Sequence, residues 1–286
     1  MVQWFGIPLT VTTVEVDEAP LPGEAPAGLA VRLARAKARI GRRTARVEGA
    51  PPASGQSLAA SRYLLAADTV VDLDGVTLGK PVDAAEAREI LAQLRGRSHR
   101  VHTAVAIAGV WSATHAGESP AVQCRGDAGR MPAVQGGAEA GESPVVRCVT
   151  SDVQMRPYTD AEIEAYIATG DPADKAGAYA IQHPGFHPVA EVHVCYANVV
   201  GLPLCAVVRL LRDASERMSV KARERKGEEV RGAEGESGWE IDIDVPALCR
   251  KHFGYDCPLK DEGRTEVDDL TQRRKDAEEQ YASLHS

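Results

Sequence analysis

The sequence LAADTVV at residues 65–71, followed by LGKP at residues 78–81, decides how this chain is interpreted. The first stretch is apolar apart from Asp68 and Thr69, which predicts a buried strand that holds one carboxylate. Lys80 comes twelve residues after Asp68, just past a predicted turn. A buried acid near a fixed ammonium group suits chemistry on a phosphorylated substrate, because the acid can activate water or hold a metal while the ammonium neutralises phosphate oxygens.

Length and composition limit the classes of protein. The chain has 286 residues, 44% of them hydrophobic, enough for one large domain or two small ones. Its formal charge of −8 argues against a nucleic-acid-binding surface. No apolar run approaches the ~20 residues of a membrane span, and the first residues do not resemble a signal peptide. The six cysteines include no C-x-x-C pair, so we expect a reduced, cytoplasmic protein rather than a disulfide framework or a zinc site.

Strands and helices are expected to alternate along the chain, which predicts an α/β fold with a central sheet and a cleft. Runs rich in β-branched or apolar residues predict strands at 7–16, 63–73, 101–110 and 192–196. The helical spacing of apolar residues, together with capping signals, predicts helices at 29–40, from an N-cap at Asp83 to Gly96, and from an N-cap at Thr159 to Gly170. Residues 198–204 are expected to lead into a further helix through Leu211.

Five motifs occur in order: ADTVV at 67–71, GKP at 79–81, LRGRSH at 94–99, DKAGAYAIQ at 174–182 and NVVGLPL at 198–204. Together they resemble the Maf family of nucleoside triphosphate pyrophosphatases, whose fold is related to that of inosine-triphosphate pyrophosphatases. The resemblance implies an elongated, mixed sheet flanked by helices, with a central cleft. It covers about residues 5–212, apart from a loop at 112–147.

The resemblance implies that a nucleoside triphosphate is hydrolysed to the monophosphate and diphosphate, with a divalent cation, Mg²⁺ or Mn²⁺. In the family the acid of the Ala-Asp-Thr motif accepts a proton, so Asp68 inherits that role. Lys80 and Lys37 match positions that contact phosphate. Attack by water on a phosphoanhydride needs a base and fixed positive charge, so these assignments are chemically consistent.

The resemblance also implies a substrate preference and partners. Thr69 and Gln182 match positions that select the base, in the combination of the branch that prefers dTTP and UTP, with modified uridine or cytidine triphosphates as further substrates. Gln182 can donate and accept hydrogen bonds at once, which suits a pyrimidine edge. Glu18 is expected to hold the metal together with Asp68, although a solvated turn acid is an equal alternative. By the same resemblance we expect a homodimer, with no nucleic-acid or membrane partner.

Two parts of the chain are expected to differ in organisation. Residues 1–212 would form the pyrophosphatase domain, interrupted by a low-complexity insertion at 112–147, where GESPAVQC at 117–124 nearly repeats as GESPVVRC at 141–148. Regular structure is expected to resume at Val149. Residues 213–286 are highly charged and predict a partly disordered extension.

One expected segment of the family has no counterpart in this sequence. The family begins with a strand and a Ser-x-Ser-Pro-Arg-Arg loop that supplies two arginines to the triphosphate, and Met1 falls after that loop. Two explanations stay open. Either the natural chain begins upstream, or the polypeptide is truncated. A truncated chain would be catalytically impaired and would act as a binding or dimerisation module.

A second class of enzyme shares part of the pattern. Residues 70–76, VVDLDGV, resemble the nucleophile motif of haloacid-dehalogenase-type phosphatases, in which Asp72 would become phosphorylated and inorganic phosphate would be released. Their second acidic motif follows an apolar strand, whereas GDPAD at 170–174 follows a predicted amphipathic helix. The sequence therefore favours the pyrophosphatase interpretation.

Overall fold

The computed structural model describes residues 1–6, 9–45, 62–110, 123–125, 143–225, 243–255 and 257. Within these residues a six-stranded sheet has the order β2-β1-β3-β5-β4, and β6 also pairs with β5. All of its pairs are antiparallel except β4 with β5, so the sheet is mixed, as predicted. The strands are β1 (Arg62–Leu73), β2 (Val76–Leu78), β3 (Ser98–Val110), β4 (Gln123–Arg125), β5 (Val145–Met155) and β6 (Val189–His193).

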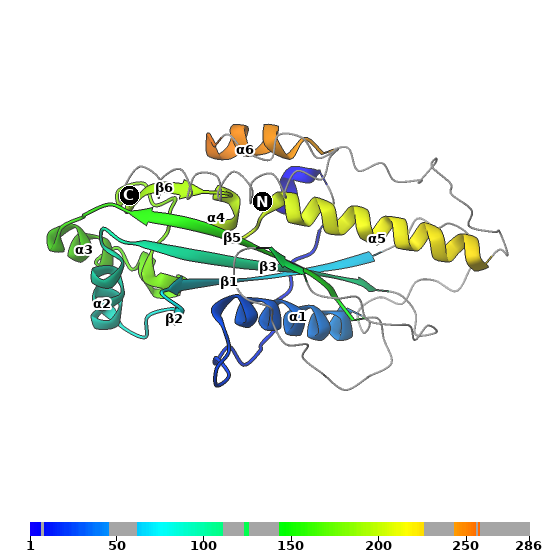
Figure 1. Cartoon of the computed structure of the whole chain (residues 1–286), viewed down its shortest axis with the longest axis horizontal. Coiled ribbons are helices and arrows are strands. Elements are labelled where there is room, and N and C mark those ends of the chain that lie inside the picture. Colours follow the sequence, from blue (N-terminus) through cyan, green and yellow to red (C-terminus); the bar gives the residue numbers. More distant parts are fainter. Residues whose placement is uncertain are drawn as a thin grey trace, which may run out of the picture.

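Helices cover both faces of the sheet, which confirms the α/β class (Figure 1). Helix α1 packs on β1 and β3 from one face, and α5 packs on β3 and β5 from the other. The α-helices are α1 (Pro26–Ala45), α2 (Ala84–Leu94), α3 (Asp160–Ile167), α4 (Tyr196–Val200), α5 (Leu204–Arg225) and α6 (Val245–Phe253). Short 3₁₀ turns add η1 (Val2–Phe5), η3 (Asp171–Asp174) and η4 (Ala176–Ala178).

A two-residue turn joins β1 to β2, as the Asp-Gly pair predicts. Asp74 and Gly75 both have positive φ, 55° and 86°, and Leu73 pairs with Val76. Backbone of this kind matches the twist of a hairpin, and glycine adopts it without steric cost. Asp72 reinforces the turn, because its Oδ1 accepts a hydrogen bond from the Gly75 N–H (2.6 Å). The hairpin returns the chain so that the Gly-Lys-Pro motif follows directly after β2.

Helix α1 buries an apolar stripe against the sheet. Leu29, Leu33, Ala34 and Ala38 are buried in the same cluster as Val70 of β1 and Ala104 of β3. The predicted helix at 29–40 is confirmed, and it extends in both directions. Pro26 suits the first turn, where its missing N–H has no helical partner to lose.

The opposite face of the sheet is covered by two apolar clusters. One lies under α4, α5 and α6 and includes Val105, Ile107 and Val207. The other lies at the α2 and α3 end and includes Val101 and Val153. Adjacent residues of a strand point to opposite faces, so odd-numbered residues of β1 and β3 pack here and even-numbered ones face α1.

Four cysteines that are far apart in the sequence lie in one apolar cluster. Cys195, Cys205, Cys249 and Cys257 are all buried, and each is a thiol rather than half of a disulfide. The last two belong to the segment around α6, which packs against the main domain. Trp4 stacks on His252 of α6 at 3.9 Å between ring centroids. Part of the chain beyond residue 212 is therefore included in the apolar core.

Several elements differ from the sequence predictions, either in existence or in their bounds. The strand predicted at 7–16 is wrong for residues 9–16, which have no regular structure. Val11 is 80% exposed, so the β-branched run has no apolar surface to cover. Strand β5 begins at Val145, before the predicted resumption at Val149, and β6 lies earlier than the predicted 192–196. Helix α5 passes residue 211 and ends at Arg225. Most of the predicted insertion and of the extension lies outside the described residues.

Candidate active site

Strand β1 places the Asp68 carboxylate on the face of the sheet that α1 covers. Asp68 pairs with Ala104 of β3, and its side chain is 9% exposed. Its neighbours on the same face, Ala66 and Val70, pack against α1. The small alanines at 66 and 104 leave room for a polar group between the strand and the helix. The structure thus confirms that the apolar stretch at 65–71 holds Asp68 as a nearly buried acid.

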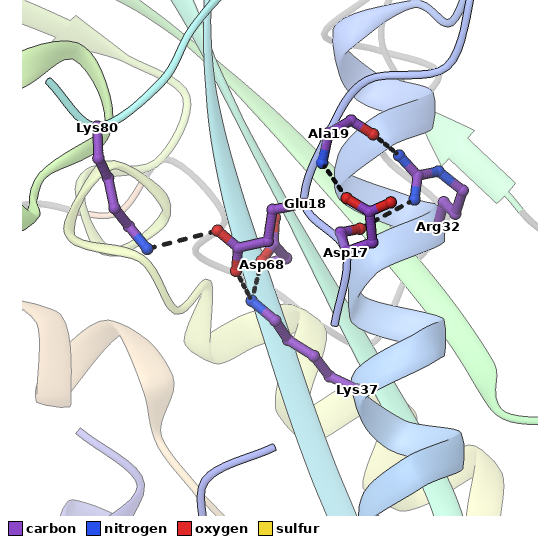
Figure 2. Close-up of polar contacts among 7 residues, drawn as sticks. All are labelled: Asp17, Glu18, Ala19, Arg32, Lys37, Asp68 and Lys80. Carbon is purple, nitrogen blue, oxygen red and sulfur yellow. Dashed lines mark hydrogen bonds and ion pairs between the residues drawn. The ribbon is translucent and has the colours of Figure 1, made fainter. Parts of the chain in front are cut away.

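Lys37 of α1 joins two of the predicted acids (Figure 2). Its Nζ donates a short hydrogen bond to Asp68 Oδ1 and another to Glu18 Oε1 at 2.9 Å. Lys80, which follows β2, reaches the second oxygen of Glu18 at 3.5 Å. Four predicted site residues from four separate segments therefore form one cluster of two ammonium groups and two carboxylates.

The pKa values in this cluster follow from burial and from the shared lysine. Burial raises the pKa of Asp68 above its ordinary value, and the contact with Lys37 offsets only part of that rise. Burial lowers the pKa of Lys37, but its bonds to Asp68 and Glu18 raise it overall. The Lys37 contact also lowers the pKa of Glu18. Lys37 thus stays protonated, while Asp68 becomes a stronger base than a solvated carboxylate.

Arg32 fixes the loop that presents Glu18, a role that the sequence did not indicate. The Arg32 guanidinium pairs with Glu24 through Nε at 2.8 Å, and it donates to the Ala19 carbonyl at 2.8 Å. Asp17 accepts a hydrogen bond from the Ala19 N–H at 3.0 Å (Figure 2). These contacts hold the turn around Glu18 against α1. The sequence shows Arg32 only as one of the basic residues interleaved with the apolar stripe of the helix predicted at 29–40.

Thr69 lies on the opposite face from Asp68. Its Oγ1 is 2.9 Å from Oγ1 of Thr103, which donates to the Asn198 carbonyl at 2.9 Å. A Cβ added to Gly201 would lie 3.4 Å from Thr69 Oγ1, so the NVVGLPL motif approaches Thr69 closely. Thr69 therefore belongs with the α4 side of the sheet and not with the Lys37 cluster.

Gln182 occupies an exposed turn between η4 and β6. In the described part of the chain its side chain forms no hydrogen bond with the other five predicted site residues. The motif that contains it is nevertheless anchored to the sheet, because the Tyr179 hydroxyl is 2.8 Å from His99 Nε2. The structure thus brings four of the six predicted residues together and places Thr69 and Gln182 elsewhere.

The donor set around Lys37 suits a hard divalent cation. Two carboxylates, Glu18 and Asp68, already share one positive charge at the Lys37 ammonium, which occupies a cation position between their oxygens. Mg²⁺ and Mn²⁺ prefer such oxygen ligands, and Mg²⁺ often takes one or two carboxylates and completes its shell with water and phosphate. Among the described residues no group of three or more His, Cys, Asp or Glu is placed to hold a metal. Glu18 and Asp68 fit a cation shared with a substrate.

Asp72, the nucleophile of the phosphatase alternative, already uses both carboxylate oxygens. Oδ1 caps the hairpin turn, and Oδ2 is 3.0 Å from Nε2 of the buried His102. Residues 171–174, the site of the second acidic motif, form the 3₁₀ turn η3 rather than the end of a strand. The geometry gives no support to a phospho-aspartate at Asp72.

Comparisons with known proteins agree on one family. A family model described as "Maf-like protein" matches residues 1–214. A "dTTP/UTP pyrophosphatase" of Geobacter sulfurreducens is 38% identical over 207 residues, which are 72% of this chain and 86% of the relative. One of Methylococcus capsulatus is 39% identical over 209 residues, 73% of this chain and 81% of the relative. One of Aromatoleum aromaticum is 36% identical over 197 residues, 69% and 76% of the two chains.

Proposed function

This chain belongs to the Maf family, and from that premise we propose that it hydrolyses dTTP and UTP to the monophosphate and diphosphate with Asp68 as the base. It is a nucleotide pyrophosphatase, a hydrolase of acid anhydrides. The observation that carries the residue assignment is the contact of one nearly buried carboxylate, Asp68, with a lysine that also holds Glu18.

The chain's own residues account for the main requirements of the reaction. Asp68 takes a proton from a water molecule, whose oxygen bonds to the α-phosphorus while the bond to the bridging oxygen breaks and diphosphate leaves with the electron pair. The raised pKa of Asp68 favours this proton transfer, because a base works best when its pKa approaches the working pH. Lys37 and Lys80 neutralise the charge that develops on the phosphate oxygens.

A divalent cation, Mg²⁺ or Mn²⁺, would be held by Glu18 and Asp68. When bound it would neutralise and polarise phosphate oxygens. Arg32 maintains the position of Glu18, since it ties the loop at 17–24 to α1. Lys37 would then exchange part of its contact with the carboxylates for contact with phosphate.

Base selection by Thr69 and Gln182 is compatible with the fold if the nucleotide crosses the edge of β1. Within the described part of the chain, positions 62–70 of β1 pair with β3 on one side only, since the pairing with β2 begins at Val71. Among the described residues, the other edge of β1 is open along these positions. Asp68 and Thr69 are therefore reachable from one strand edge although their side chains point to opposite faces. The triphosphate would lie toward α1, and the pyrimidine would lie toward α4 and the turn of Gln182.

The test compares two buried acids of the same strand face. Asp68→Asn should lower release of diphosphate from dTTP by about 10³-fold, because the general base is lost. Asp72→Asn should keep most of the turnover, because Asp72 stabilises the hairpin and asparagine can still accept the Gly75 hydrogen bond. Products should be separated, so that diphosphate is distinguished from inorganic phosphate.

Two outcomes would favour the alternatives. Release of inorganic phosphate, lost in Asp72→Asn and kept in Asp68→Asn, would support the phosphatase. Tight nucleotide binding without hydrolysis by the unaltered chain would support a binding or dimerisation module.

Several expectations accompany this proposal. They are a homodimer, a cytoplasmic location, modified uridine or cytidine triphosphates as further substrates, and a domain boundary at 212/213 with a charged extension beyond it. Within the described part of the chain, every helix is too short or too polar to span a lipid bilayer. Helix α5 continues across residue 212, so the proposed boundary falls inside a helix.

A further inference from the structure

The turn formed by η3 and η4 lies directly beside the Gly-Lys-Pro motif. The Gly177 N–H donates to the Gly79 carbonyl at 3.0 Å. Gly177 has φ 70°, and a Cβ at that position would lie 3.0 Å from a methyl carbon of Val71. Only a residue without a side chain allows this close approach. The turn is therefore pinned next to Lys80, although about a hundred residues separate the two segments in sequence.

This turn presents a third lysine. The Lys175 ammonium contacts the Asp174 carboxylate and lies 3.6 Å from Asp171 Oδ1, with a side chain that is 32% exposed. Asp174 is largely exposed, and its pKa is lowered first by Lys175 and further by the charge of Lys80. Asp174 thus lies within electrostatic reach of two lysines from different segments.

Three lysines from three segments could each bind a phosphate group of a polyanion. Lys37 pairs with Asp68, Lys80 pairs with Glu18, and Lys175 pairs with Asp174. Each ammonium is held by a carboxylate, and the partners of Lys80 and Lys175 are exposed, so phosphate oxygens can replace them at little cost in desolvation. Lys37 lies nearest to the base, so the more distant lysines are positioned for the more distant phosphates.

We propose that Lys175 binds the diphosphate portion of the substrate, the part that leaves, and that Asp174 competes with it for the ammonium when no nucleotide is bound. This assignment rests on the proposed pyrophosphatase function. It adds a substrate-binding residue from the DKAGAYAIQ motif beside Lys37 and Lys80. Lys175 takes no part in proton transfer.

Substitutions of Lys175 and of Asp174 should change the affinity for diphosphate in opposite directions. Lys175→Met should raise KM for dTTP and the inhibition constant of inorganic diphosphate by about 5- to 20-fold, the range for one charge-assisted hydrogen bond at a partly exposed site. Inhibition by dTMP should not change. Asp174→Asn should tighten inhibition by diphosphate, because the competing carboxylate is gone. Lys175→Arg should retain most of the affinity. Lys251→Met removes an exposed charge on α6 and is the matched control.

A purely structural role for Lys175 predicts a different pattern. Both Lys175→Met and Asp174→Asn would then lower the thermal midpoint, and inhibition by diphosphate would stay at the level of the unaltered protein in both. That result would overturn the inference. It differs from failure of the proposed function, in which the unaltered protein would release no diphosphate or Asp68→Asn would retain full activity.

Discussion

The two faces of the central sheet differ in the side chains that they bury. The face under α1 contains the charged cluster, in which Lys37 joins Asp68 to Glu18 above a layer of alanines. The face under α4, α5 and α6 is largely apolar, contains four buried thiols, and has the uncharged Thr69–Thr103 contact as its polar part. Asp68 and Thr69 are neighbours in sequence, yet one belongs to each face. The charged side chains of the proposed site therefore lie on the α1 face, and the other face, apart from Thr69, mainly packs the core.

The comparison leads to a simple expectation about variants. Changes in the charged cluster under α1 should lower activity much more than stability. On the opposite face, changes away from Thr69, the proposed base-selecting residue, should alter stability and leave the chemistry intact.

After that of Asp68→Asn, the largest effect is expected at Lys37. Lys37→Met should lower kcat/KM for dTTP by about 10²- to 10³-fold, because one fixed donor to the phosphates is lost. The lysine also lowers the pKa of Asp68. Without it that pKa rises further, so the acid limb of the kcat/KM profile, where Asp68 must lose its proton, should move to higher pH.

Arg39→Met is the matched control for Lys37, since it removes an exposed charge from the same helix. If Lys37→Met kept the activity and the pH profile of Arg39→Met, the charged face would have no part in the reaction.

On the opposite face, His99 should make stability depend on pH. Burial lowers the pKa of His99 to about 4, against an ordinary value of 6.5. Below pH 6.5 His99 is protonated in the unfolded chain but stays neutral in the folded chain. The free energy of unfolding therefore decreases as the pH falls from 6.5 to about 4. The loss from this one group should reach about 3 kcal/mol. Denaturant unfolding at several pH values measures it.

A variant isolates this contribution of His99. His99→Gln keeps a polar partner for Tyr179 and should lose stability less steeply over the same pH range. The exposed His187 provides the control, since His187→Gln should follow the unaltered protein. Equal slopes in all three proteins would contradict the assignment.

The smallest effect is expected at Val194, between β6 and α4. Val194 has φ 82°, a conformation that costs a β-branched residue about 1–3 kcal/mol. Its side chain is 42% exposed, so little burial would be lost on truncation. Val194→Gly should stabilise the protein by about 1 kcal/mol after the entropic cost of glycine. Val192→Gly, within β6, should destabilise it, and a loss of stability in both variants would rule out backbone strain at Val194.

Local sequence signals predicted much of the fold. The Asp-Gly pair at 74–75 predicted the hairpin. Asp83 and Thr159 predicted the starts of α2 and α3, and both side chains accept the expected backbone hydrogen bonds. The strand prediction at 7–16 was wrong for residues 9–16, because strand propensity alone does not pair a segment with a sheet.

The site was harder to predict, because its contacts join segments that are distant in sequence. Asp68, Lys37, Glu18 and Lys80 came largely from the family resemblance, and the structure brings them together. Strand alternation alone separates Thr69 from Asp68, so that signal was present in the sequence. The cluster of four cysteines had no such signal, because their spacing matches no metal or redox motif and only the packing of α6 brings them together.

The most direct test is a crystal structure with a dTTP analogue whose α–β bridging oxygen is replaced by a methylene group. The phosphates should lie on the α1 side of β1, within hydrogen-bonding distance of the ammonium groups of Lys37 and Lys80, with the α-phosphorus facing Asp68. Phosphates bound on the side of Thr69 and α4, away from the Asp68 carboxylate, would contradict the account.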